Sequence, residues 1–252
     1  MLFSGLASVT FRKLSPAQII DLVVQGQLDG IEWGGDIHVP PGDLTKARQV
    51  RQMTLDAGLQ VLSYGSYYRV AHDDPATFDS VLEAAVELGA PTLRVWAGRR
   101  GSADADAAYR DLVARDSRRI AELAAAQGVF VAYEYHSGTL TDDPASTRAL
   151  LEKVAHENLG TYWQIYGDAD SALQALDAVL PWLCNVHAYY SVDGERRLMA
   201  DGQADWQRYL KKIKSSGRDH AVMIEFVKDE STEFFLREAA TLRGWTQASQ
   251  SR

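Results

Sequence analysis

Short runs rich in β-branched and aromatic residues recur along the chain, and a longer segment with helical periodicity follows each of them. The eight strand-like runs are at 2–9, 30–35, 60–68, 92–98, 129–136, 161–166, 184–190 and 221–227. The helical segments are at 16–25, 44–57, 76–88, 104–126, 145–156, 171–180, 204–214 and 231–243. Strict alternation of eight strands and eight helices predicts parallel strands joined by helical crossovers.

Residues at the segment boundaries support this division. Ser15, Pro16 and Gln18 offer an N-cap serine, a proline in the first helical position and a glutamine in the third. The rival arrangement is a doubly wound Rossmann-type sheet, but neither G-x-G-x-x-G nor a P-loop follows the first strand. We therefore predict a single (β/α)8 TIM barrel over residues 1–245 and a polar C-terminal tail at 246–252.

Composition narrows the set of partners. The 252 residues carry a formal net charge of −8 and no basic stripe, which argues against nucleic acid as a ligand. The single cysteine, Cys184, rules out a disulfide framework and suits a reducing compartment. No window approaches the roughly 18 apolar residues of a membrane span. We expect a cytoplasmic protein without a membrane partner, and the sequence leaves a homo-oligomer open.

Polar residues stand near the carboxyl ends of four successive predicted strands, where active sites of such barrels lie. They are Glu134 in YEYH, Gln164 in YWQIY, His187 in NVHAYY and Glu225 in MIEFV. A carboxylate buried among apolar residues without a partner costs several kcal/mol or keeps its proton. A shared cation would remove that cost.

Side chains alternate between the two faces of a strand, so Ala132, Glu134 and His136 share one face. If these faces point into the barrel, all four polar groups converge. Two carboxylates, one imidazole and one amide oxygen form a hard ligand set. Such a set suits one divalent ion, Mn²⁺ above all, with Mg²⁺, Co²⁺ and Zn²⁺ as alternatives.

With these motifs the sequence resembles the xylose isomerase-like TIM barrels, the superfamily of sugar isomerases and epimerases, inosose dehydratases and endonuclease IV. The matching segments are 30–43, 133–143, 162–166, 185–190 and 223–227. Members of the ketose epimerase type hold one metal through Glu, Asp, His and Glu, which implies the ligands Glu134, Gln164, His187 and Glu225 here. Gln164 replaces the usual aspartate, so the ligands carry −2 rather than −3, and metal affinity should fall.

The resemblance also implies chemistry, namely proton transfer beside a carbonyl with Glu134 and Glu225 as acid and base. His136 is then expected to bind substrate. The other residues that we expect near the substrate are Glu32, Trp33, Asp36, His38, Tyr67, Tyr68, Arg69, Arg94, Trp96, Arg196 and Arg197. Either arginine of the last pair could bind an anionic group.

Two classes of function remain open from the sequence. The leading one is a metal-dependent isomerase or epimerase of a small sugar or polyol, with a dehydratase or lyase of a keto-sugar or inosose as its nearest variant. The other class is a non-catalytic carbohydrate-binding barrel, and Gln164 in the metal set is its best support.

Overall fold

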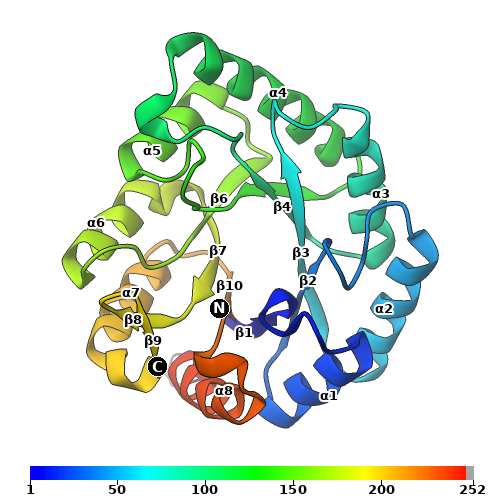
Figure 1. Ribbon diagram of the computed structural model, residues 1–252, viewed down its shortest axis with the longest axis vertical. Helices are drawn as coiled ribbons and strands as arrows, with labels where there is room; N and C mark the ends of the chain where they lie inside the picture. Colours follow the sequence, from blue (N-terminus) through cyan, green and yellow to red (C-terminus); the bar gives the residue numbers. More distant parts are fainter. Residues whose placement is uncertain (248–252) are drawn as a thin grey trace.

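The computed structural model describes residues 1–247 of the chain, in which eight parallel strands close into a barrel (Figure 1). The order around the barrel is β1-β10-β7-β6-β5-β4-β3-β2. The strands are β1 (Leu2–Ala7), β2 (Gly30–Gly34), β3 (Gln60–Arg69), β4 (Thr92–Trp96), β5 (Phe130–Tyr133), β6 (Leu159–Trp163), β7 (Leu183–Ala188) and β10 (His220–Ile224). The predicted (β/α)8 barrel is confirmed.

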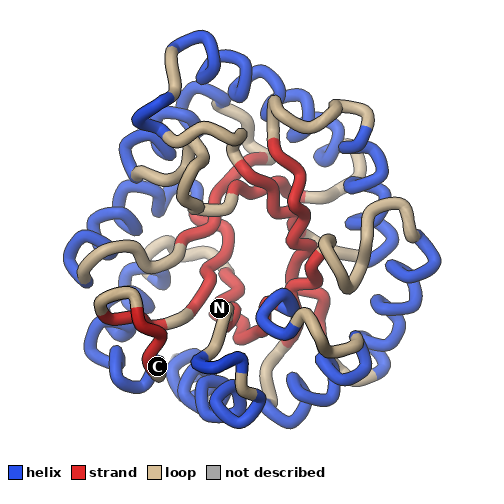
Figure 2. The backbone as a smooth tube through the Cα atoms, in the orientation of Figure 1, coloured by secondary structure: helices blue, strands red, loops and turns tan. Residues whose placement is uncertain are grey.

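Eight α-helices form the outer ring around these strands (Figure 2). They are α1 (Pro16–Gly26), α2 (Leu44–Asp56), α3 (Thr77–Leu88), α4 (Ala107–Ala125), α5 (Pro144–Val154), α6 (Ala169–Val179), α7 (Gln203–Lys214) and α8 (Thr232–Gln247). The predicted capping box is present before α1, where Ser15 and Gln18 bond each other's backbone N–H. Helix α8 continues to Gln247, and positions 248–252 of the predicted tail lie outside the described residues.

A small antiparallel ribbon beyond β7 was not predicted. It consists of β8 (Tyr190–Val192) and β9 (Glu195–Arg197). Asp193 and Gly194 connect the two strands with φ of 53° and 79°, the left-handed backbone that a tight two-residue hairpin turn requires. Because the ribbon follows the carboxyl end of β7, it borders the mouth of the barrel (Figure 1).

Alternation along the strands divides the core in two. Val131 and Tyr133 pack in the main core beneath the helices, whereas Ala132 joins Tyr162 and Met223 in a separate apolar cluster. The predicted sharing of strand faces is therefore confirmed for this part of β5. No helix within residues 1–247 is both long and apolar enough to cross a membrane.

Strand β3 contains an irregularity that matters for the site. Ile31 pairs with Val61, but Glu32 pairs with Ser63, so one extra residue, Leu62, is inserted in β3. A bulge of this kind exchanges the inward and outward faces beyond it. From Ser63 onward, the side chains of β3 therefore point to the face opposite to the one that uninterrupted alternation along the strand predicts.

Candidate functional site

Three of the four predicted metal ligands meet at the mouth of the barrel. His187 lies on β7, while Glu134 and Glu225 directly follow β5 and β10. All three are buried, and one ligand atom from each lies within 4.8 Å of the others. His187 Nδ1 is 3.3 Å from Glu225 Oε2 and 3.9 Å from Glu134 Oε1. Two carboxylates and an imidazole nitrogen thus face a common point, as in a divalent metal site.

The fourth predicted ligand, Gln164, follows β6 and is also buried. Its Nε2 donates a hydrogen bond to the Tyr135 carbonyl, which fixes the amide plane. Its Oε1 is buried and has no hydrogen-bond partner among the described residues. A buried acceptor without a partner is unfavourable, so this oxygen is available to a ligand or a cation.

A charged network forms the floor beneath these groups. Arg94 on β4 is 2% exposed, and its Nη1 donates to Glu134 while its Nε donates to Glu32 Oε1 over 3.2 Å. The same Glu32 oxygen is 3.1 Å from His187 Nε2. Arg94 therefore links the predicted ligand Glu134 to a carboxylate on the other side of the imidazole.

The network perturbs the pKa values of its members. Burial would raise the pKa of Glu32 and Glu225, but attraction to Arg94 and His187 outweighs it and holds both pKa values below their ordinary range. Burial likewise opposes the charged form of His187, yet the neighbouring Glu225 and Glu32 raise its pKa to about 9. The carboxylates of Glu32 and Glu225 are thus kept ionised, the form that binds a cation.

An aromatic stack forms one wall of the mouth. The Trp96 indole N–H donates to Glu134 Oε2, and the Trp96 ring stacks on His136 with centroids 4.5 Å apart. The Arg69 guanidinium covers Trp96, with Cζ 3.8 Å from the ring centroid. Within residues 1–247, no carboxylate forms an ion pair with the Arg69 side chain. This wall therefore carries a guanidinium on the face of Trp96, and the Asp73 carboxylate bonds to the Arg69 backbone N–H and not to its side chain.

The other expected substrate contacts separate into two groups. Glu32, Arg94, Trp96 and His136 gather around the ligand cluster. Tyr68 instead lies behind β3, where it is buried, accepts a hydrogen bond from Arg119 over 3.0 Å and packs against a ring of α3.

The bulge at Leu62 explains the placement of Tyr68. Because of it, the neighbouring Tyr67 faces the barrel interior and lies 5.7 Å from Trp96. Sequence reasoning missed Ser63 and Gly65, which face inward for the same reason and contact Glu32 and Arg94. No local signal in the sequence reveals the extra residue.

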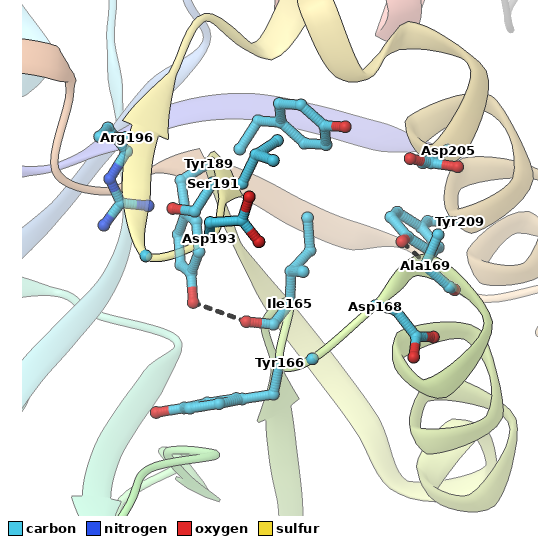
Figure 3. Close-up of a pocket in the computed structure, with 14 residues that line it drawn as sticks. Ile165, Tyr166, Asp168, Ala169, Tyr189, Ser191, Asp193, Arg196, Asp205 and Tyr209 are labelled. Carbon is cyan, nitrogen blue, oxygen red and sulfur yellow. Dashed lines mark hydrogen bonds between the residues drawn. The ribbon is translucent and has the colours of Figure 1, made fainter.

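A cavity of about 610 Å³ adjoins the mouth between the loop after β6 and the β8–β9 ribbon (Figure 3). Tyr189 lies between this cavity and the mouth. Its hydroxyl donates a hydrogen bond to the Ile165 carbonyl, and the Arg196 Cζ lies 3.9 Å from the centroid of its ring. Arg196 and Tyr189 also line a small space shared with Glu225. Arg197 also lines this small space, but it is exposed and forms an ion pair with Glu195. Of the two adjacent arginines, Arg196 is the more buried and the one that stacks on Tyr189.

Comparisons with known proteins agree with this geometry. The sequence model of the xylose isomerase-like TIM barrel family matches residues 20–247. A 3-dehydroshikimate dehydratase of Bacillus anthracis is 26% identical over 199 residues, which cover 73% of this chain and 70% of that protein.

Solved structures share the fold across almost the whole chain. A probable 3-DHS dehydratase of Bacillus anthracis superposes with a TM-score of 0.81 at 21% identity, covering 96% of this chain and 99% of the other. A D-psicose 3-epimerase of Clostridium cellulolyticum H10 superposes with a TM-score of 0.76 at 14% identity, covering 98% of each chain.

Proposed function

Because the chain belongs to the xylose isomerase-like TIM barrel family, a superfamily of sugar isomerases and epimerases, we propose that it is a metal-dependent enzyme that removes a proton beside a carbonyl. Its proposed substrate is a hydroxylated cyclic keto acid of the 3-dehydroshikimate type, from which it eliminates water. The proposed ligands of one divalent ion, preferably Mn²⁺, are Glu134, Gln164, His187 and Glu225.

The charges in the cluster support a divalent ion. Three carboxylates, those of Glu32, Glu134 and Glu225, face one guanidinium, that of Arg94, around His187. The proton that His187 holds at its pKa of about 9 must leave when the imidazole ligates a metal. With the carboxylates ionised and the imidazole neutral in this state, the cluster has a buried excess of two negative charges. One divalent cation would neutralise it, and the unpartnered Gln164 oxygen offers a further neutral ligand. When bound, the ion would polarise the substrate carbonyl and stabilise the charge that develops on its oxygen.

A difference between the two glutamates is the observation that carries the proposal of a dehydratase. Glu134 Oε2 accepts hydrogen bonds from both Arg94 and Trp96, so this carboxylate is held on the wall of the site. Among the described residues, only His187 forms an ion pair with the Glu225 carboxylate. Each glutamate keeps one oxygen without a hydrogen-bond donor among the described residues, but Glu225 lacks the two donors that fix Glu134, so Glu225 is the better candidate for a general base.

The elimination of water needs a single carboxylate, that of Glu225, as base and then as acid. Glu225 takes the proton from the carbon beside the carbonyl, and the electron pair of that C–H bond passes into the carbonyl group. As the pair returns, a carbon–carbon double bond forms and the bond to the β-hydroxyl breaks. The hydroxyl leaves as water with the proton that Glu225 returns, so the base is regenerated and no other reactant is consumed. Trp96 and His136 would line the substrate on the side of β4 and β5.

Arg69 supports an acidic substrate. Its guanidinium lies on the face of Trp96, and no carboxylate of the described residues pairs with it. A planar guanidinium binds a carboxylate through two parallel hydrogen bonds. The similar dehydratase is named for 3-dehydroshikimate, which carries such a carboxylate.

Epimerisation of a ketose is the second candidate, and it is favoured by the pair of glutamates on facing sides of the barrel. It needs Glu225 to remove the proton and Glu134 to return one to the opposite face of the carbon. The bonds from Arg94 and Trp96 to Glu134 Oε2 oppose this second role, because they favour the ionised carboxylate and fix its orientation.

The test uses the purified chain loaded with Mn²⁺ and two kinds of substrate. We expect loss of water from 3-dehydroshikimate, which creates an aromatic ring and a new near-ultraviolet absorption. D-Fructose and D-tagatose in D₂O should show no deuterium at carbon by NMR. Label in a ketose together with its epimer would favour epimerisation. Binding of a sugar or polyol with no turnover of any compound would favour the carbohydrate-binding barrel.

Variants at Arg69 test the acidic substrate separately. Arg69→Met should raise KM for the keto acid by about 10–100-fold, as expected for losing a charge-assisted hydrogen-bonded pair, while kcat changes little. Lys13→Met removes an exposed positive charge elsewhere and should leave KM unchanged. An unchanged KM in Arg69→Met would contradict the proposed role of this guanidinium.

A further inference from the structure

Glu32 is the most enclosed carboxylate of the site, and all its contacts are with protein groups. It is 1% exposed. Its Oε1 lies 3.1 Å from His187 Nε2 and 3.2 Å from Arg94 Nε, and its Oε2 accepts a hydrogen bond from Ser63 Oγ over 2.7 Å. Because the side chain is enclosed and both oxygens already have polar partners, Glu32 presents no exposed oxygen to a substrate.

Strand β3 makes the space for this arrangement. A Cβ atom at Gly65 would lie 2.6 Å from Arg94 Nη2 and 3.1 Å from Glu32 Oε1. The insertion of Leu62 brings both Ser63 and Gly65 to the inward face. Ser63 donates a hydrogen bond to Glu32, and Gly65, which has no side chain, leaves room for Arg94 and Glu32. Any side chain at 65 would therefore push Arg94 or Glu32 out of position.

The contact with Glu32 determines which imidazole nitrogen is free. Arg94 and Ser63 hold the Glu32 carboxylate beside His187, so Glu32 Oε1 accepts a hydrogen bond from the His187 Nε2–H. The other nitrogen, Nδ1, then faces the Glu134 and Glu225 carboxylates, at 3.9 and 3.3 Å. A histidine can coordinate a metal only through a nitrogen that carries no proton.

We propose that Glu32 is a positioning residue that keeps the His187 proton on Nε2 and directs Nδ1 toward the metal, and that Arg94 and Ser63 hold the Glu32 carboxylate in place for this purpose. The inference rests on the metal site of the proposed function. It assigns Glu32 to the imidazole and removes it from the expected substrate contacts. A carboxylate that accepts from a ligating histidine also makes the imidazole a stronger ligand, and removing such a partner commonly costs 10–100-fold in metal affinity.

Calorimetric titration of the metal-free protein with Mn²⁺ tests the first part. We expect Glu32→Ala to raise the Kd by about 10–100-fold. Glu32→Gln, which keeps the volume and an acceptor oxygen but loses the charge, should lie between Glu32→Ala and the wild type. Glu238→Gln is the matched control, because it removes a buried carboxylate whose two oxygens accept from the Met199 backbone N–H. It should bind Mn²⁺ like the wild type.

The position of the proton provides a readout that does not depend on affinity or activity. ¹⁵N NMR of the Mg²⁺-loaded wild type, with His187 assigned through His187→Gln, should show the proton on Nε2. A proton on Nδ1 would overturn the inference, as would wild-type affinity in both Glu32 variants. If the wild type binds neither ion, the metal site of the proposed function fails and the inference fails with it. That outcome is distinct from metal binding that is insensitive to Glu32.

Discussion

The upper and lower parts of the barrel interior differ sharply, although the same strands build both. Ala132 lies in β5, and Glu134 lies above it, just after the strand ends. Met223 lies in β10, and Glu225 lies above it, again just after the strand ends. The lower part is an apolar cluster, whereas the upper part holds three carboxylates, a guanidinium and an imidazole.

One aromatic residue joins the two parts. The ring of Tyr162 packs edge-on against His187 with centroids 5.1 Å apart, and its hydroxyl accepts a hydrogen bond from Asn185. Burial holds the pKa of Tyr162 well above its ordinary value, so the hydroxyl stays neutral beneath the charged network. The comparison shows that strand alternation points a side chain inward, while its height along the strand decides whether it serves packing or chemistry.

The largest effect is expected from replacing the free carboxylate of the upper part. Glu225→Gln should lower kcat by about 10²–10⁴-fold, because it removes the positioned base. The paired variant two residues lower, Met223→Leu, conserves volume and should cost less than about 1.5 kcal/mol of stability. Steady-state turnover and circular dichroism measure both. Equal activity in the two variants would remove Glu225 from the reaction.

Much of this contrast could be predicted from the sequence, because it depends on local patterns. Alternating strand-like and helical segments predicted the barrel, and period-two spacing predicted that Ala132 and Glu134 share a face. The convergence of Glu134, His187 and Glu225 followed from their places at strand ends.

The rest could not be predicted because it depends on contacts between distant strands. Glu32 and His187 are 155 residues apart and meet only because the barrel closes. The bulge at Leu62 turns Tyr67 inward instead of Tyr68, and no residue type marks it. The β8–β9 ribbon is different, because it is local: Asp193-Gly194 is a dipeptide typical of tight hairpin turns, and sequence reasoning missed it within a polar loop.

The second prediction tests how far Arg94 stabilises the charged layer. Arg94→Met leaves Glu32 and Glu134 without their shared cation, which should lower the free energy of unfolding of the metal-free protein by about 3–5 kcal/mol. Saturating Mn²⁺ should restore part of that loss, because it supplies positive charge at the same place. Urea unfolding with and without the ion measures both quantities.

Thr92 offers the control for Arg94 from the lower part of the same strand. It is buried, and its hydroxyl contacts only Cys184 Sγ, at 3.7 Å. Thr92→Val should cost about 1 kcal/mol and respond to Mn²⁺ like the wild type. A loss in Arg94→Met no larger than that in Thr92→Val would mean that the upper part does not depend on the guanidinium.

The third prediction concerns Glu238, a buried carboxylate of α8 that lies outside the charged network. Burial raises its pKa to about 7, although both its oxygens accept from the Met199 N–H. The folded protein therefore holds this proton more tightly than the unfolded chain. Stability should fall as pH rises from about 4.5 to 7, by at most about 3 kcal/mol, and then level off.

Glu238→Gln isolates this contribution, because an amide does not titrate. The difference in unfolding free energy between variant and wild type, measured by urea at pH 5 and pH 8, should change in favour of the variant at the higher pH. Parallel pH profiles for the two proteins would show that Glu238 titrates alike in the folded and unfolded states.

The smallest effect is expected at Gln164, the one proposed ligand that carries no charge. Gln164→Asp adds a negative oxygen facing the other ligands and should lower the Kd for Mn²⁺ on the order of tenfold, about 1.4 kcal/mol. Gln164→Asn shortens the side chain equally but stays neutral. It therefore distinguishes the effect of the added charge from the effect of the shorter side chain. Both variants lose the hydrogen bond of Nε2 to the Tyr135 carbonyl in its present geometry, which makes that loss common to the pair. Tighter binding in Gln164→Asp than in Gln164→Asn therefore reports charge at the cation, and equal affinities would mean that the buried Oε1 faces something other than the metal.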